Sequence, residues 1–207
     1  MTAKIKLNAA SGGGSFSLQA HSYSANNRVF KLTDLADATL LTTNTATGKV
    51  INYAQKFETA VVSHDIQASQ VTNDLIFLDY TAASSSNKLL IMASLCVTVQ
   101  NGANGKLFGY LYIGGSVSAA IGDAASNRLR VSFQNQNFND VNMSPASHNY
   151  LLSSPATSST RYSYKFSHTD VSGDGYKGII LNKPHGDTDN NTFGRSTSSI
   201  TILEFAP

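Results

Sequence analysis

From residue 50 onward, the chain consists of short stretches in which apolar and polar residues alternate, separated by clusters of Gly, Ser, Asn and Thr. A period of two is typical of a strand with one buried face, and such clusters are typical of turns. The pattern predicts strands over 56–62, 66–71, 75–80, 88–99, 106–113, 117–121, 128–138, 147–152, 161–168, 178–181 and 198–204. We therefore expect an all-β protein with an antiparallel, jelly-roll-like β-sandwich over 50–207.

The longest nearly unbroken apolar run is Lys88–Val99, which ends at the turn-forming stretch Asn101–Gly105. Its second half alternates and is rich in β-branched residues, which favours a strand over a buried helix. Its first half is apolar at consecutive positions, so we expect cover on both faces there. This run is predicted to be the central strand of the sandwich, with Cys96 as a small buried hydrophobic residue.

The stretch 106–113 is apolar or aromatic on both of its faces. One face carries Phe108, Tyr110 and Tyr112, and the opposite face carries Leu, Gly and Ile. A sheet with aromatic residues on its outer face requires a second surface to meet, either another chain or a ligand. We expect Phe108, Tyr110 and Tyr112 to form part of an interface between copies of the chain.

Residues 1–49 differ from the rest, because each apolar piece is too short to close a core of its own. Two alternating strands are expected, around Ile5 and Leu7 and around Phe16 and Leu18. Such a segment is either a flexible tail or an extended stalk that is buried by pairing with other chains, and the alternation favours the stalk. The predicted organisation is an extended N-terminal β/coil segment followed by the sandwich domain.

Charged residues make up only 14% of the chain, against about 25% in typical soluble domains. Uncharged hydroxyls and amides replace them, and such a surface suits packing beside copies of itself. The formal net charge is +2 with no Lys/Arg cluster, so we expect no nucleic-acid partner. The N-terminus lacks the apolar core of a signal peptide and no run reaches transmembrane length, so we expect synthesis in a cytoplasm and no membrane insertion.

The motif closest to a metal site is Asp170–Gly175, which matches the first, third and fifth positions of an EF-hand calcium loop. The twelfth position is Leu181 instead of Glu, and the flanking pattern predicts strands, so a glycine-rich hairpin tip is favoured. Asp187 and Asp189 beside His185 have no third fixed ligand nearby. The single cysteine excludes a disulfide framework and a multi-cysteine zinc site. Without a nucleophile elbow or phosphate loop, we expect no catalytic residues, no metal and no cofactor.

Several stretches are similar to those of known proteins: Ala3–Ala20, Asn26–Leu32, Ser84–Ala93, Ile121–Ala125 and Ser198–Glu204. The first two resemble the N-termini of structural virion proteins from marine tailed phages of the cyanophage type, and the others resemble a β-rich domain that recurs in such proteins. The resemblance implies trimeric fibres or spikes of the virion, with an N-terminal part that attaches to the particle and an exposed C-terminal sandwich. The apolar residues expected to mediate attachment are Ile5, Leu7, Phe16, Leu18, Val29, Phe30 and Leu32.

Together these features predict a short trimeric tail fibre or tail-tip appendage that binds a host surface glycan or protein and contacts other virion proteins. If the ligand is a glycan, the candidate binding loops are 135–142 and 185–191, which are rich in Asn. A capsid decoration or head fibre is the alternative. A polysaccharide-degrading tailspike is a second alternative, disfavoured because it requires a much longer β-helix with repeated rungs.

Overall fold

The computed structural model describes residues 4–8, 15–19, 48–100, 105–137, 143–169, 177–186 and 194–207. The chain divides into two compact units, Met1–Leu40 and Leu41–Pro207. The domain division expected between residues 49 and 50 remains a prediction.

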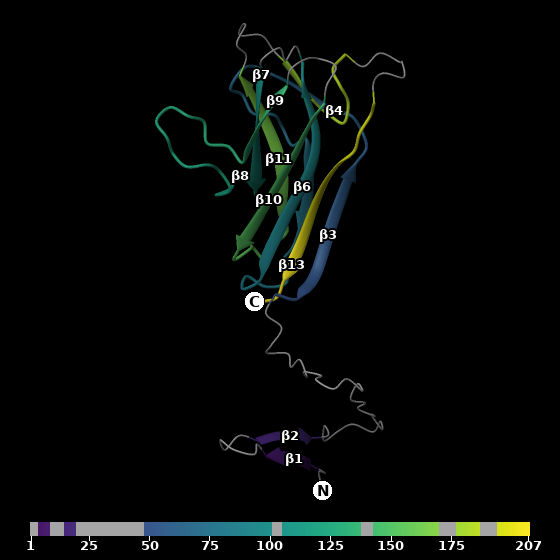
Figure 1. The fold of residues 1–207 in the computed structure, drawn as a ribbon, viewed down its shortest axis with the longest axis vertical. Coiled ribbons are helices and arrows are strands. Elements are labelled where there is room, and N and C mark those ends of the chain that lie inside the picture. Colours follow the sequence, from purple (N-terminus) through teal and green to yellow (C-terminus); the bar gives the residue numbers. More distant parts are fainter. Residues whose placement is uncertain are drawn as a thin grey trace. The chain divides into compact units, whose positions relative to one another are not determined.

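The described part of the first unit is a two-stranded antiparallel sheet of β1 (Lys4–Asn8) and β2 (Ser15–Gln19) (Figure 1). Its register places Ile5 opposite Leu18 and Leu7 opposite Phe16. Because successive positions of a strand alternate between faces, these four positions belong to one face of the hairpin. An isolated two-stranded hairpin is at best marginally stable in water.

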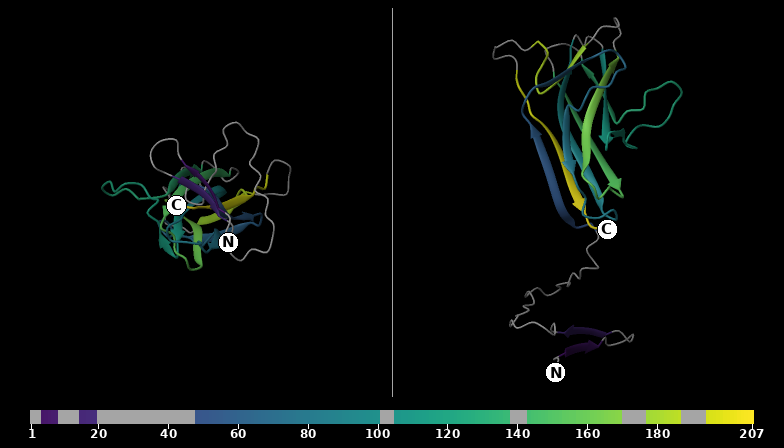
Figure 2. Two further views of the ribbon diagram at one scale, coloured as in Figure 1. Left: turned by 90° about the horizontal axis from the view of Figure 1, so that it is seen from below. Right: turned by 180° about the vertical axis from the view of Figure 1, so that it is seen from behind.

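The second unit is built from strands, and its described residues contain no helix (Figures 1 and 2). In chain order the strands are β3 (Val50–Glu58), β4 (Val62–Ile66), β5 (Ile76–Tyr80), β6 (Lys88–Val99), β7 (Gly105–Ile113), β8 (Ser116–Val117), β9 (Phe133–Asn137), β10 (Ser144–Ser153), β11 (Thr160–Thr169), β12 (Lys177–Leu181) and β13 (Ser198–Phe205). The sequence pattern therefore identifies β5, β6, β7, β10, β11, β12 and β13 to within three residues.

These strands form two antiparallel sheets. The six-stranded sheet has the order β3-β13-β6-β12-β4, with β10 on the other edge of β6. The five-stranded sheet has the order β5-β11-β7-β8, with β9 also paired to β7. The first strands of the unit thus pair with the last, and the chain crosses between the sheets repeatedly, which is the jelly-roll arrangement. The expected all-β antiparallel sandwich is confirmed.

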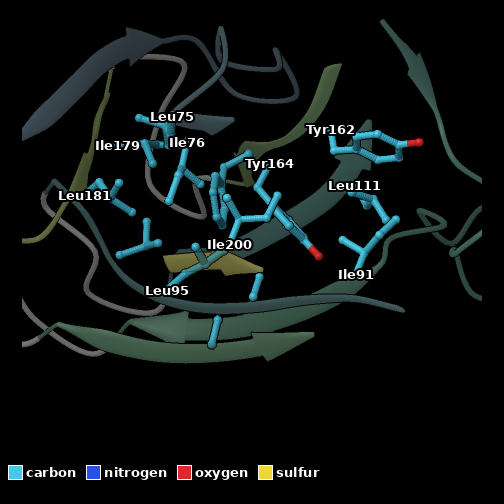
Figure 3. Close-up of a cluster of buried hydrophobic side chains, with 14 of the residues drawn as sticks. Leu75, Ile76, Ile91, Leu95, Leu111, Tyr162, Tyr164, Ile179, Leu181 and Ile200 are labelled. Carbon is cyan, nitrogen blue, oxygen red and sulfur yellow. The ribbon is translucent and has the colours of Figure 1, made fainter. Parts of the chain in front are cut away.

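The core lies between the two sheets and is filled by the inward-facing positions of both (Figure 3). The largest fully buried side chains include Tyr162, Tyr164 and Phe166 of β11, which face Ile91 of β6 and Ile200 of β13 among others. Complete burial of one such side chain stabilises the fold by about 1.5–3 kcal/mol.

The predicted strand 56–62 is wrong, because β3 ends at Glu58 and β4 begins at Val62. A buried asparagine from a distant part of the chain holds the turn between them. Asn182 is fully buried and has a φ of 69°. Its Nδ2 donates hydrogen bonds to the carbonyl oxygens of Glu58 (2.7 Å) and Ala60 (3.0 Å), between β3 and β4. Its Oδ1 accepts a hydrogen bond from the Ser198 hydroxyl at 2.7 Å. One side chain therefore joins three separate parts of the six-stranded sheet.

Three further predictions, 66–71, 117–121 and 128–138, are wrong in part or completely. β4 ends at residue 66, β8 is only two residues long, and β9 begins at residue 133. Ser69 has a φ of 67° and Ser126 a φ of 51°. Such values are uncommon for residues other than glycine and interrupt an extended chain. The alternation of apolar residues does not reveal these turns.

A buried carboxylate holds the end of β13. Glu204 Oε1 accepts hydrogen bonds from the Ala83 N–H (2.8 Å) and from Asn87 Nδ2 (2.5 Å), and its Oε2 accepts one from the Tyr80 hydroxyl (2.7 Å). Burial alone would raise the pKa of Glu204, but the donors outweigh burial and lower this pKa below the ordinary value of 4.5. Burial and the bond to Glu204 also raise the pKa of Tyr80, so its hydroxyl remains a donor.

Candidate interaction surface

Four strands of the six-stranded sheet, β3, β13, β6 and β10, form one stretch of its outer face with their outward-facing positions. Strand pairing aligns these positions in rows that cross the four strands. The first row lies at the end where β3 begins and β13 ends, which we call the base. From the base, the rows are Val50, Phe205, Lys88 and Ser153; Tyr53, Leu203, Leu90 and Leu151; Gln55, Thr201, Met92 and Asn149; and Phe57, Ser199, Ser94 and Ser147.

The second row is apolar across all four strands, and we call Tyr53, Leu203, Leu90 and Leu151 the apolar row. Its outer members are exposed: Tyr53 retains 69% of its surface and Leu151 retains 51%. Leu203 and Leu90 between them are half-buried. Cross-strand neighbours lie close enough for their side chains to touch, so the row forms a continuous apolar band, and the described residues of the second unit leave its outer members exposed.

Away from the base, the same face becomes polar. The row of Gln55, Thr201, Met92 and Asn149 combines two amides, a hydroxyl and a thioether, and the Gln55 amide donates to the Thr201 hydroxyl at 2.9 Å. The last row carries three serines beside Phe57, which is 63% exposed on the edge strand β3. The apolar surface is therefore concentrated at the base.

The first half of β6 explains why this face is apolar. Consecutive apolar positions predict cover on both faces there, but Leu90 and Met92 are only half-buried, whereas Leu89 and Ile91 are completely buried. The second half has the cover on both faces that the first half lacks, since Val97, Thr98 and Val99 are all buried. The expectation is therefore wrong for the described part of the single chain, where the outer side of the first half is only partly covered.

The two sheets of the sandwich differ in the charge of their outer faces. Strands β3, β13, β6 and β10 place one charged side chain, Lys88, on the outer face of the six-stranded sheet. The five-stranded sheet instead carries ion pairs of Arg161 with Asp79 (2.9 Å) and of Lys165 with Asp74 (3.4 Å). Charged side chains are depleted in the centres of interfaces, so the face of these four strands is better suited to one than the face of the five-stranded sheet. Asp65 of β4 lies on the same side of the six-stranded sheet but outside these four strands.

The free edge of β3 has a feature that disfavours pairing with another strand. Lys56 lies opposite Ile200, on the inner face, and its Nζ contacts the Phe77 ring at 4.5 Å from the ring centre. It also forms an ion pair with Glu58 at 3.2 Å. Inward-pointing charges on an edge strand are a device that opposes edge-to-edge association. A partner on this side is thus expected to contact the face of the sheet and not its edge.

The residues predicted for an oligomer interface lie on the outer side of the five-stranded sheet, and the chain itself covers two of them. Phe108 and Tyr110 retain only 6% and 9% of their surface, and the Tyr110 hydroxyl lies 3.1 Å from the Ser167 hydroxyl. Tyr112 is half-buried, with the Lys165 ammonium over its ring. Their role in an interface remains a prediction, and the apolar row is the surface that the sequence pattern missed.

The predicted attachment and loop residues are described only in part. Val29, Phe30 and Leu32 lie outside the described residues, as do the calcium-like loop 170–175 and the pair Asp187 and Asp189. Of the candidate ligand-binding loops, residues 135–137 and 185–186 are described. The last residues of β9 adjoin the first residues of β7, at the end of the sandwich opposite the base.

Cys96, predicted to be a small buried hydrophobic residue, is only half-buried and lies opposite Pro145 on the outer face of β6. It lies on the face where the central strand is only partly covered. Among the described residues, no group of three or more His, Cys, Asp or Glu side chains could hold a metal ion. The described residues also include no helix long and apolar enough to cross a membrane.

Comparisons with known proteins give only distant similarity. No protein-family model and no curated protein matches the chain. It is similar to a solved structure of the infectious bursal disease virus Gx strain, at 13% identity over 75% of this chain and 37% of the other, with a TM-score of 0.36. A Gt strain structure matches at 14% identity over 94% and 48%, also with a TM-score of 0.36. A VP2 subviral particle of the same virus matches at 12% identity over 75% and 38%, with a TM-score of 0.34, so this chain spans less than half of each.

Proposed function

We propose that the protein is a structural component of a tailed-phage virion, a short trimeric tail fibre or tail-tip appendage whose sandwich binds a host surface. The observation that carries this proposal is the jelly-roll order of the strands, since viral capsid and lectin domains are typical uses of that arrangement. The sequence resemblance of Ala3–Ala20 and Asn26–Leu32 to phage virion proteins supports the same role.

The arrangement of the sandwich supports a protein with one attached end and one free end. The N-terminal segment joins the sandwich at the base, where β3 begins beside the end of β13. The ends of β6, β9 and β11 and the starts of β7, β10 and β12 lie at the opposite end. In this proposal the N-terminal segment contacts other virion proteins, and the connections opposite the base contact the host glycan or protein.

A capsid decoration or head fibre is the second candidate, and the use of jelly rolls in viral shells favours it. An electron-microscopy map of the particle tests both candidates through the position of residues 4–19. Contact of these residues with tail proteins supports the tail appendage, and contact with the shell supports the decoration. A particle map with no density for the sandwich at either place contradicts both.

A further inference from the structure

We propose that copies of this chain contact one another through the apolar row at the base of the six-stranded sheet, with Phe57 and the residues between as the rest of the contact. This inference rests on the proposed trimer and names the surface that forms it. The interface expected from the sequence, around Tyr110 on the other sheet, is not needed in this arrangement because the chain already covers that residue.

The exposed apolar area of the face is a substantial part of what a stable contact requires. Large aromatic side chains bury about 150–250 Å² each, so Tyr53 at 69% exposure and Phe57 at 63% offer roughly 200–330 Å² together. Val50 and Leu151 are each about half exposed and add to this. Stable interfaces bury about 800 Å² on each partner, which this face approaches once the half-buried residues between are included.

The chemistry of the face favours a second copy of the chain over a different protein. On these four strands the one charged group, Lys88, lies in the first row at the base, so the faces of three copies can converge around a three-fold axis without several like charges being opposed. A different protein is usually selected through complementary charges, and this face of the four strands carries almost no charge that could select one. The surrounding Ser, Thr, Asn and Gln side chains both donate and accept hydrogen bonds, so the same groups can pair with themselves.

The place of the apolar row in the fold is consistent with this occupant. It lies one row from Val50, where the N-terminal segment joins the sandwich. If N-terminal segments of several copies associate as a stalk, the bases of their sandwiches are held together at high effective concentration. Even a weak apolar contact between the sandwiches then forms. The inward-pointing Lys56 opposes strand addition at the edge of β3, so the copies meet through faces.

The test is sedimentation of the full chain carrying Leu151→Lys or Tyr53→Lys, with Leu129→Lys as the matched control. Leu129 is 52% exposed, almost the same as Leu151 at 51%, but it lies in the connection between β8 and β9. Lysine at the apolar row brings like charges into the contact, whereas the control adds the same charge elsewhere. We expect the wild type and the control to sediment as three copies of 22.0 kDa, and both apolar-row variants as one copy.

Circular dichroism and thermal unfolding verify that each variant is folded. If Leu151→Lys unfolds, the test of the interface rests on Tyr53→Lys, which changes a more exposed side chain. If both apolar-row variants remain trimeric, or if Leu129→Lys dissociates as they do, the inference is wrong while the proposed trimer stands. A wild type that is monomeric at micromolar concentration overturns both the inference and the trimeric part of the proposed function.

Discussion

The buried carboxylate of Glu204 allows a quantitative prediction. Removing it with Glu204→Ala takes the acceptor away from the buried donors of Tyr80 and Asn87 and from the partly buried N–H of Ala83. Each buried donor left unsatisfied costs about 1–3 kcal/mol. Because water can enter the vacated space and satisfy some of them, we expect a loss of about 3–6 kcal/mol, a large part of the roughly 5–15 kcal/mol that stabilises a typical domain.

Glu204→Gln separates the charge from the shape of this side chain. The amide keeps one oxygen as an acceptor, but its NH₂ replaces the second oxygen and the charge is lost. Hydrogen bonds to charged groups contribute about 1.5–3 kcal/mol, against about 0.5–1.5 kcal/mol for neutral ones, so a loss of about 2–3 kcal/mol is expected. Glu58→Gln is the control, since Glu58 is the other glutamate of the chain and forms a partly exposed ion pair with Lys56. Such pairs contribute about 0–1 kcal/mol.

The pH dependence gives an independent check. The pKa of Glu204 is lowered in the folded protein, so the unfolded chain takes up a proton more readily on this group. Its contribution is therefore complete above the ordinary pKa of 4.5 and is lost as the pH falls through the lower folded pKa. Glu204→Gln should remove that part of the acid destabilisation.

The assay is urea unfolding followed by circular dichroism, at fixed protein concentration because association changes apparent stability. It is performed at pH 7 and at steps below pH 5. Equal stability of Glu204→Gln and the wild type at pH 7, or an unchanged acid slope in the variant, would refute the assigned role of Glu204.

Three further predictions concern the interior. A Cβ at Gly109 would overlap the Phe133 ring, so Gly109→Ala should destabilise by about 1–3 kcal/mol in thermal or urea unfolding, with partial recovery in Phe133→Leu; an unchanged midpoint contradicts this packing. Asn182→Asp should cost at least as much as Asn182→Ala in urea unfolding, because its carboxylate would face the carbonyl oxygens of Glu58 and Ala60 to which the amide now donates; a clearly smaller loss in Asn182→Asp would argue against these hydrogen bonds. Burial lowers the pKa of His148, whose Nδ1 lies 2.9 Å from the Tyr164 hydroxyl, so stability should fall as the pH drops below about 6.5, and His148→Gln should flatten that dependence in urea midpoints; an equal slope in the variant contradicts it.

The strands of the sandwich could be predicted where one face is buried, because period-two alternation is then visible in the sequence. β11 shows this, with Tyr162, Tyr164 and Phe166 inside. The turn at Asn182 could not be predicted, since its hydrogen bonds connect residues that are 122 and 124 positions apart in the chain. Ser69 gave no local signal either, because serine is tolerated in both extended and turn conformations.

The candidate surface could be predicted only in principle. The sequence shows that 106–113 and 88–99 are each apolar on two faces, but not which of the four faces the chain covers by itself. The structure shows that Tyr110 is covered and Leu90 is partly open. The apolar row also depends on the register of four strands, and Tyr53 and Leu151 are 98 residues apart in the chain.

The most direct test of the proposed function is the protein composition of purified particles. Phage particles are banded in a density gradient, and each fraction is assayed for infectivity and, by quantitative mass spectrometry, for peptides of this chain. We predict that the chain co-sediments with infectivity at a fixed number of copies per particle, in a multiple of three. Recovery of the chain only in the fractions without particles would contradict a structural role in the virion.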